Sequence, residues 1–309
     1  MKDKLRIGLA QLNFLVGDID KNTQKIVAIA EQARDNHHAG IVVYSELTVC
    51  GYPPEDLLFR EDILLRVNEA RKRLLAVRDI VLVVGLPAQG KNGLENRAEV
   101  FFNGQILATY AKQHLPNHSV FDEKRYFIRG AANQNTTFTI KGVSFSLGIC
   151  EDFWSPAFID YINAIEQPVD VLLSLNASPY HNIQAEKRLN IIQQCCKQTS
   201  LPVVYVNQTG GQDELVFDGS SFVMNATGET ALTADSYKEH LYITDYNMTA
   251  KLFEQGYHAP AMSSEENIYH ALMLGLRDYV IKNGFKGVVL GLSGGIDSAL
   301  VLAIAVDAL

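Results

Sequence analysis

Short apolar runs rich in β-branched residues recur along most of the chain and predict β-strands. They lie at residues 6–10, 41–44, 80–85, 143–149, 169–175 and 203–206. Helical periodicity separates several of these runs and predicts helices from Asp20 to just before Gly40, across residues 61–78 and across residues 184–199. This alternation is typical of α/β proteins.

Turn signals of the hairpin type interrupt the strand–helix alternation. Asn103-Gly104 and Lys141-Gly142 each stand between two strand-like runs, and residues 226–229 form a third turn signal. Hairpins join antiparallel strands, whereas the helical connections join parallel ones, so we expect mixed sheets. Sheets that carry helices on their outer faces are the expected arrangement.

The pattern weakens after Tyr246, and a segment with Gly, Pro and Ser follows. A helix across residues 265–283, an apolar strand at residues 287–290, a glycine-rich turn and the start of another helix come next. We therefore expect a first domain over residues 1–248, a linker over residues 249–264, and the first part of a second domain over residues 265–309.

Composition and charge restrict the class of partner. The 309 residues are 47% hydrophobic and 20% charged, as in globular proteins, and the formal net charge is −8. This charge does not favour binding to nucleic acid or anionic lipid, and no apolar run approaches the ~18–20 residues that span a bilayer. Four cysteines without a C-x-x-C pair favour a reducing compartment. We expect a cytoplasmic protein that acts on small molecules.

Three polar side chains end three different predicted strands. Glu46 follows the run at 41–44, Lys112 ends the second arm of the Asn103-Gly104 hairpin, and Cys150 follows the run at 143–149. Each has an ordinary explanation alone: an ion-paired loop carboxylate, a solvated edge-strand charge and a packed thiol. Strand ends in α/β sheets gather ligands, however, and a cysteine nucleophile needs a nearby base and cation.

The surroundings of these residues resemble the nitrilase, or carbon–nitrogen hydrolase, superfamily. The similar segments are SELTVCGYPPEDLL, KQHLPNHSVFDEKRYF and GICEDFW, and the resemblance spans about residues 5–245. It implies an α-β-β-α sandwich and an amidase in which Glu46 is the base and Cys150 the nucleophile. It further implies that Lys112 and the backbone N–H of Glu151 stabilise the oxyanion, and that Glu123 positions Lys112.

The same resemblance implies a glutamine-binding set. Its positions fall on His118, Ser178 and Gln184. His118 stands where tyrosine is frequent in the family, and Gln184 stands where a basic residue is usual. Arg188 on the same predicted helix is a candidate to supply the missing positive charge.

The glycine-rich turn at residues 291–298 follows an apolar run and opens a helix, a geometry that presents backbone N–H groups to an anion. It has no lysine and is not a Walker A loop. SGGIDS resembles the pyrophosphate loop of N-type ATP pyrophosphatases, which have a Rossmann-like fold. The resemblance implies that ATP, with Mg²⁺, contacts these residues: Gly291, Leu292, Ser293, Gly294, Gly295, Ile296, Asp297 and Ser298.

A nitrilase-type domain followed by this loop resembles the glutamine-dependent NAD⁺ synthetases. The resemblance implies that L-glutamine is hydrolysed without a cofactor or metal, and that the ammonia amidates adenylated deamido-NAD⁺ at the expense of ATP. It implies a homo-oligomer as well. The rest of the synthetase domain lies outside this chain, so we expect the chain alone to release ammonia and not to make NAD⁺.

Other hypotheses are a stand-alone nitrilase-type hydrolase and an inactive module for assembly or regulation. SGGIDS counts against the first, and the intact set of Glu46, Lys112 and Cys150 counts against the second. A redox sensor at Cys150 lacks an adjacent resolving cysteine.

Overall fold

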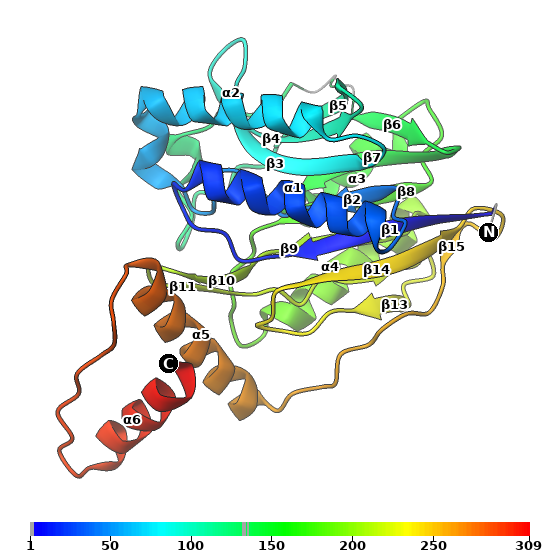
Figure 1. Cartoon of the computed structure of the whole chain (residues 1–309). Coiled ribbons are helices and arrows are strands. Elements are labelled where there is room, and N and C mark those ends of the chain that lie inside the picture. Colours follow the sequence, from blue (N-terminus) through cyan, green and yellow to red (C-terminus); the bar gives the residue numbers. More distant parts are fainter. Residues whose placement is uncertain (1–2, 132–133, 135) are drawn as a thin grey trace.

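Two β-sheets lie face to face between two layers of helices (Figure 1). The computed structural model describes residues 3–131, 134 and 136–309. The first sheet has the strand order β15 (Leu252–Phe253), β14 (His240–Asn247), β1 (Lys4–Gln11), β2 (Ile41–Val43), β3 (Val81–Gln89), β4 (Leu94–Phe102) and β5 (Gln105–Ala111). The second has the order β13 (Thr230–Thr233), β12 (Phe222–Met224), β9 (Val203–Asn207), β8 (Val171–Asn176), β7 (Val143–Ile149) and β6 (Thr137–Ile140).

Alternating strand residues fill two separate cores. Ile41 and Val43 belong to the cluster that lies between the sheets, whereas Val42 packs with α1 (Ile19–Asp35) and α2 (Glu61–Ala76). The helices α3 (Pro156–Asn163) and α4 (Gln184–Thr199) cover the second sheet. Strands buried on both faces therefore read as continuous apolar runs. The result is the α-β-β-α sandwich expected from the sequence.

The predicted hairpins are present, and their backbone angles explain the sequence signals. Asn103 and Gly104 have φ of +47° and +88° between β4 and β5, and Lys141 and Gly142 have φ of +50° and +84° between β6 and β7. Two successive residues with positive φ match the twist of the flanking strands. A third turn joins β12 to β13.

Two local expectations differ from the structure. The cap of α1 is Asp18, whose Oδ1 accepts the Lys21 N–H at 3.2 Å, and the helix ends at Asp35, ahead of Gly40. The predicted strand at residues 287–290 does not form. Its side chains are exposed, and in the described part of the chain no strand lies beside it to share a hydrogen-bond ladder.

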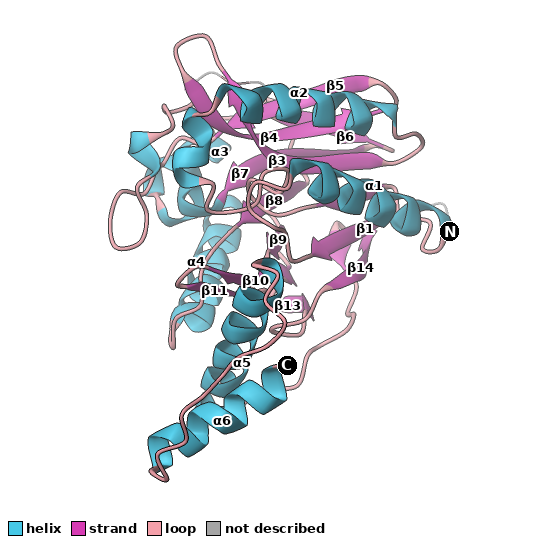
Figure 2. Cartoon of the chain, turned by 60° about the vertical axis from the view of Figure 1, so that its left-hand side comes forward, coloured by secondary structure: helices cyan, strands magenta, loops and turns pink. Residues whose placement is uncertain are grey.

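The last two helices stand apart from the sandwich (Figure 2). Helix α5 (Ser264–Lys282) packs on the small hairpin of β10 (Thr209–Gln212) and β11 (Leu215–Asp218), and α6 (Ile296–Ala308) packs on α5. No described helix has both the length and the apolar composition needed to cross a membrane.

Candidate active site

The catalytic candidates gather at one edge of the two sheets. Glu46 follows β2 and Lys112 follows β5 in the first sheet, while Cys150 follows β7 in the second. Strand β2 is parallel to β3, and two antiparallel pairings link β3 to β5 through β4, so the carboxyl ends of β2 and β5 lie at the same edge of the first sheet. In the second sheet β7 is parallel to β8, so Cys150 and Ala177 lie at the same edge. The Ala177 N–H, just after β8, donates to Glu46 Oε2 at 3.2 Å and so links the two sheets.

Lys112 lies buried between two carboxylates. Its Nζ is 2.6 Å from Glu46 Oε1 and 2.8 Å from Glu123 Oε1, and its side chain is 1% exposed. Burial lowers the pKa of Lys112, but the charges of Glu123 and Glu46 outweigh it and hold the pKa well above its ordinary value. The lysine is therefore a fixed ammonium group inside the protein, as oxyanion stabilisation requires.

Each carboxylate also accepts a hydrogen bond from a neutral side chain. Asn96 Nδ2 donates to Glu46 Oε1 at 2.7 Å, and the Tyr52 hydroxyl donates to Glu123 Oε1 at 3.0 Å. Burial raises the pKa of Glu123 to about 7, although the charge of Lys112 opposes this rise. Glu123 therefore changes its charge near neutral pH.

Cys150 stands at a strained turn. It is the first residue of the short 3₁₀ helix η3 (Cys150–Trp154), directly after β7, and has φ of +45°. Such values are uncommon for a residue with a side chain and concentrate at functional sites. The buried Asp152 carboxylate fixes the turn by accepting the N–H groups of Ile149, Gln113 and His114 at 3.0, 3.1 and 2.9 Å. One acidic side chain thus ties the cysteine turn to the segment after Lys112.

The thiol of Cys150 is protonated at rest. Burial raises its pKa well above the ordinary value, the charge of Glu46 raises it further, and the charge of Lys112 lowers it. With its pKa raised, the thiol needs a base to remove its proton before it can act as a nucleophile. Glu46 is the carboxylate with the largest charge effect on this thiol.

One cavity of about 380 Å³ opens onto Cys150 and holds the predicted glutamine-binding positions. Its lining includes His118, Ser178, Pro179, Tyr180, Gln184 and Leu215. A carboxylate from Glu151 and an ammonium from Lys187 line it as well, and Lys187 is the one lysine or arginine among the lining residues described. The sequence reasoning missed Lys187.

The predicted phosphate loop lies outside this cavity, on the segment before α6. Gly294 has φ of +84°, Gly295 is the N-terminal cap of α6, and the Ser293 and Ser298 hydroxyl oxygens lie 3.0 Å apart. A Cβ added at Gly291 or Gly294 would meet no atom within 4 Å. The N-terminus of α6 is therefore open to an anion, and the backbone N–H groups there are chemically suited to bind a phosphate group.

Comparison with known proteins assigns the larger part of the chain. The carbon–nitrogen hydrolase model matches residues 6–250. This chain belongs to the carbon–nitrogen hydrolase family. The NAD synthase model matches residues 268–309.

Relatives that align with nearly all of this chain are glutamine-dependent NAD⁺ synthetases. The protein from Acinetobacter baylyi is 44% identical over 98% of this chain and 56% of its own length. The Acinetobacter baumannii enzyme, solved in complex with ADP, has a TM-score of 0.95 and 45% identity over 99% of this chain and 57% of that chain. The chain thus spans about half the length of these relatives.

An amidase of the nitrilase superfamily from Nesterenkonia AN1 shares the fold. It has a TM-score of 0.70 and 24% identity, covering 80% of this chain and 92% of that one. The sandwich of this carbon–nitrogen hydrolase is therefore the nitrilase-type fold expected from the sequence.

Arg188 does not supply the missing positive charge in this carbon–nitrogen hydrolase. Its side chain is 1% exposed, and its guanidinium binds both carboxylate oxygens of Asp218 at 2.8 and 2.9 Å. Nε donates to Ser178 Oγ at 3.1 Å. The structure thus contradicts the suggestion that Arg188 binds the substrate carboxylate, because a buried arginine is stable here only with its partner Asp218.

Two residues of the candidate site, Asn96 and Lys187, were not predicted from the sequence. Asn96 is the third residue of β4, and its contact with Glu46 depends on strand pairing. Lys187 could have been found, because residues three apart on a helix share a face and Gln184 begins α4.

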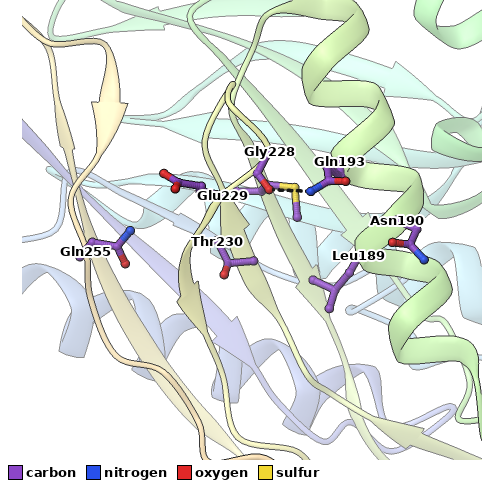
Figure 3. A pocket seen from close by; sticks show the side chains of 8 residues that line it. Leu189, Asn190, Gln193, Gly228, Glu229, Thr230 and Gln255 are labelled. Carbon is purple, nitrogen blue, oxygen red and sulfur yellow. Dashed lines mark hydrogen bonds between the residues drawn. The ribbon is translucent and has the colours of Figure 1, made fainter.

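A second cavity, of about 460 Å³, lies between α4 and the turn that joins β12 to β13 (Figure 3). Figure 3 shows amide and hydroxyl side chains around it, with Gln193 Nε2 donating to the Gly228 carbonyl at 3.0 Å. No member of the catalytic set is among its lining residues. Of the two cavities, the one described first is therefore the one that contains Cys150.

Proposed function

We propose that this chain hydrolyses L-glutamine to glutamate and ammonia, as the amidase part of a glutamine-dependent NAD⁺ synthetase. The observation that carries the proposal is the buried Glu46–Lys112–Glu123 cluster, next to a thiol that opens into a cavity with one ammonium and one carboxylate. The whole-chain similarity to synthetases of that name supports it.

In the first half of the reaction, Glu46 accepts the Cys150 proton as Sγ attacks the carboxamide carbon. The π electrons of the carbonyl move to its oxygen, and the tetrahedral intermediate forms. Glu46 then returns the proton to the amide nitrogen, the C–N bond breaks, and ammonia leaves. A γ-glutamyl thioester on Cys150 remains.

In the second half, Glu46 takes a proton from a water molecule, whose oxygen attacks the thioester carbon. The C–S bond breaks, and the proton passes to the cysteine sulfur. Glutamate leaves, and the resting thiol is restored. The same carboxylate therefore serves both halves, as microscopic reversibility allows.

Lys112 and the Glu151 backbone N–H stabilise the oxyanion in this proposal. Lys112 is a permanent ammonium, and Glu151 lies in the first turn of η3, where N–H groups have no partner within the helix. Donors of this kind typically contribute about 3–4 kcal/mol each to the transition state. Glu123 acts through Lys112, as a positioning residue.

Substrate recognition follows from the charges at the cavity. An amino-acid amide carries a carboxylate and an ammonium besides its reacting amide, and the cavity offers Lys187 and Glu151 as their counterparts. We assign Lys187 to the α-carboxylate. It takes the role of the basic residue that is usual in the family at the position of Gln184. Ser178 and His118 line the same cavity and complete the binding set.

The chain has two functional units in this proposal. Residues 1–248 form the amidase, and residues 265–309 form the first part of the synthetase unit. A linker over residues 249–264 joins them. The residues from Gly291 to Ser298 would contact the phosphates of ATP through the N–H groups at the start of α6. ATP with Mg²⁺ activates the carboxyl group of deamido-NAD⁺ when bound. We place the protein in the cytoplasm as a homo-oligomer, and its four free thiols support the compartment.

The test is ammonia release from glutamine by the purified chain, with Cys150→Ala as the variant and Cys195→Ala, in the remote part of α4, as its matched control. We expect Cys150→Ala to lower kcat by at least about 1,000-fold and Cys195→Ala to retain activity. Asparagine should be a poor substrate. Undiminished release from Cys150→Ala would overturn the mechanism, and no release from a folded wild-type chain would overturn the function.

A further inference from the structure

Asp278 is a buried carboxylate on α5, outside the amidase sandwich. It is 6% exposed, and its Oδ2 accepts the Gly211 N–H at 2.6 Å and the Asn13 side-chain amide at 2.7 Å. Lys282, one turn further along the helix, lies 3.2 Å from the same oxygen and donates to the Gly211 carbonyl at 2.7 Å. Asp278 and Lys282 therefore bind both backbone polar groups of one residue of β10.

The helix lies directly on the β10–β11 hairpin because both elements have glycine at the contact. A Cβ at Gly211 would lie 3.0 Å from Gly275 Cα and 3.1 Å from Asp278 Cβ. A Cβ at Gly275 would lie 3.0 Å from Val216 Cγ2. With so little free space, a shift of α5 must move the hairpin.

The hairpin forms part of the wall of the catalytic cavity. Leu215, the first residue of β11, lines the cavity beside Cys150 and Ser178. The carbonyl of the adjacent Val216 accepts the N–H of Tyr180 at 2.7 Å, and Tyr180 is a further lining residue. A continuous set of contacts thus leads from α5 through the hairpin to the substrate cavity, and Figure 1 shows these elements side by side.

We propose that Asp278 is a positioning residue of the amidase, which holds the β10–β11 hairpin so that Leu215 and Tyr180 close the substrate cavity. The helix that follows the amidase unit thereby sets the shape of the amidase site. The proposal uses the glutaminase activity proposed above as one readout. It concerns substrate binding, because none of these residues contacts the Glu46–Lys112 pair.

The first test compares Asp278→Ala with Glu265→Ala, an exposed acidic residue on the same helix. Loss of the carboxylate leaves the Gly211 N–H without its acceptor and Lys282 without its charged partner, so we expect KM for glutamine to rise by about 3- to 30-fold. We expect kcat to change by less than about twofold, since a positioning role affects binding and not the chemical step. Glu265→Ala should leave both constants unchanged.

A double-mutant cycle with Leu215→Ala separates positioning from a general loss of stability. If Asp278 acts through Leu215, the two effects on KM are not additive, and Asp278→Ala changes KM little in the Leu215→Ala background. Additive effects, or an unchanged KM in a folded Asp278→Ala protein, would overturn the proposal. Gly275→Ala provides a second variant, because its Cβ would press on Val216 without removing the carboxylate of Asp278.

A readout without glutamine keeps this proposal distinct from the proposed function. Iodoacetamide reaches Cys150 through the cavity, and peptide mapping reports its alkylation rate separately from the other three cysteines. We expect faster alkylation in Asp278→Ala than in wild type or Glu265→Ala. Equal rates in all three proteins would contradict the positioning role, whether or not glutamine proves to be the substrate.

Discussion

At the scale of single residues, the protonation of Glu123 has the clearest chemical consequence. When Glu123 is neutral, Lys112 keeps only one charged carboxylate partner, so its ammonium group is held less firmly in the place where it would stabilise the oxyanion. The amidase should therefore lose activity as the pH falls through the pKa of Glu123, which is about 7.

We predict an acidic limb near pH 7 in the profile of kcat/KM for glutamine. Glu123→Gln should show reduced activity at all pH values and no such limb, because glutamine cannot change charge. Tyr52→Phe should move the limb to higher pH, since the hydrogen bond from Tyr52 lowers the pKa of Glu123. A limb that stays at the same pH in Glu123→Gln would assign it to another group.

Stability should respond to the same carboxyl group. Its pKa in the folded protein lies above the ordinary value, so the folded state binds this proton more tightly than the unfolded chain. The resulting stabilisation is present at low pH and is lost as the pH rises through about 7. Urea unfolding of wild type and Glu123→Gln on both sides of that pH measures the loss, which should be absent in the variant.

Lys187 gives a second prediction at this scale. Lys187→Ala should raise KM for glutamine by about 10- to 100-fold, the usual effect of losing a hydrogen bond to a charged group. Lys197→Ala, an exposed lysine on the same helix, should have no effect. Adding Gln184→Lys to Lys187→Ala should restore most of the affinity, and failure of this rescue would argue against the assigned role.

The sequence predicted that the candidate catalytic residues lie together, but it did not predict their supporting contacts. Glu46, Lys112 and Cys150 were predictable because each follows a recognisable strand in a motif of distinct local pattern. Asn96 could not be predicted, since its contact depends on how β4 lies beside the turn after β2. Arg188 looked available in the sequence, and its burial against Asp218 appears only when α4 and β11 come together.

At the scale of elements, the turn that carries Glu46 depends on a glycine in the neighbouring strand. A Cβ at Gly85 of β3 would lie 2.4 Å from Leu47 N and 2.6 Å from Ser45 O, and these backbone atoms cannot rotate away. The close approach lets the turn after β2 pass over β3. The catalytic glutamate therefore sits on a tightly held backbone.

Gly85→Ala should displace this turn and lower kcat/KM for glutamine by at least about 100-fold, as expected for a misplacement of about 1 Å in a catalytic group. The free energy of unfolding should fall by about 1–3 kcal/mol from overpacking. Gly287→Ala is the matched control, because its Cβ would meet nothing within 4 Å. Steady-state kinetics and urea unfolding of both variants provide the measurement.

The predicted strand at residues 287–290 shows that a hydrophobic pattern alone does not establish a secondary-structure element. Its apolar residues are strand-like, yet a strand needs a neighbour with which to exchange hydrogen bonds. Helix α5 needs no neighbouring element for its hydrogen bonds, because its capping box at Ser263 and Glu266 is local. Local signals were therefore sufficient for the helix and insufficient for the strand.

At the scale of the whole molecule, α6 leaves apolar side chains uncovered. Ile296 is 85% exposed, Val306 is 68% exposed and Leu300 is 52% exposed. An exposed apolar surface of this kind marks a site for contact with other protein.

We predict that the isolated chain self-associates through α6 as its concentration rises. Val306→Asp should reduce this association, which sedimentation velocity measures, because burying an unpaired carboxylate is unfavourable. The amidase kinetics of Val306→Asp should match wild type, since α6 does not line the cavity at Cys150. Association unchanged by this substitution would place the contact elsewhere.

Because a buried lysine lies between two carboxylates, the first proton transfer leaves the net charge of the site unchanged. Above the pKa of Glu123, the cluster with its thiol holds two negative charges and one positive charge. Moving the proton from Cys150 to Glu46 relocates one negative charge from oxygen to sulfur and leaves that balance unchanged. No mobile ion has to enter to compensate, so added salt should leave kcat almost untouched while weakening the attraction that the solvent-facing Lys187 exerts on an incoming carboxylate.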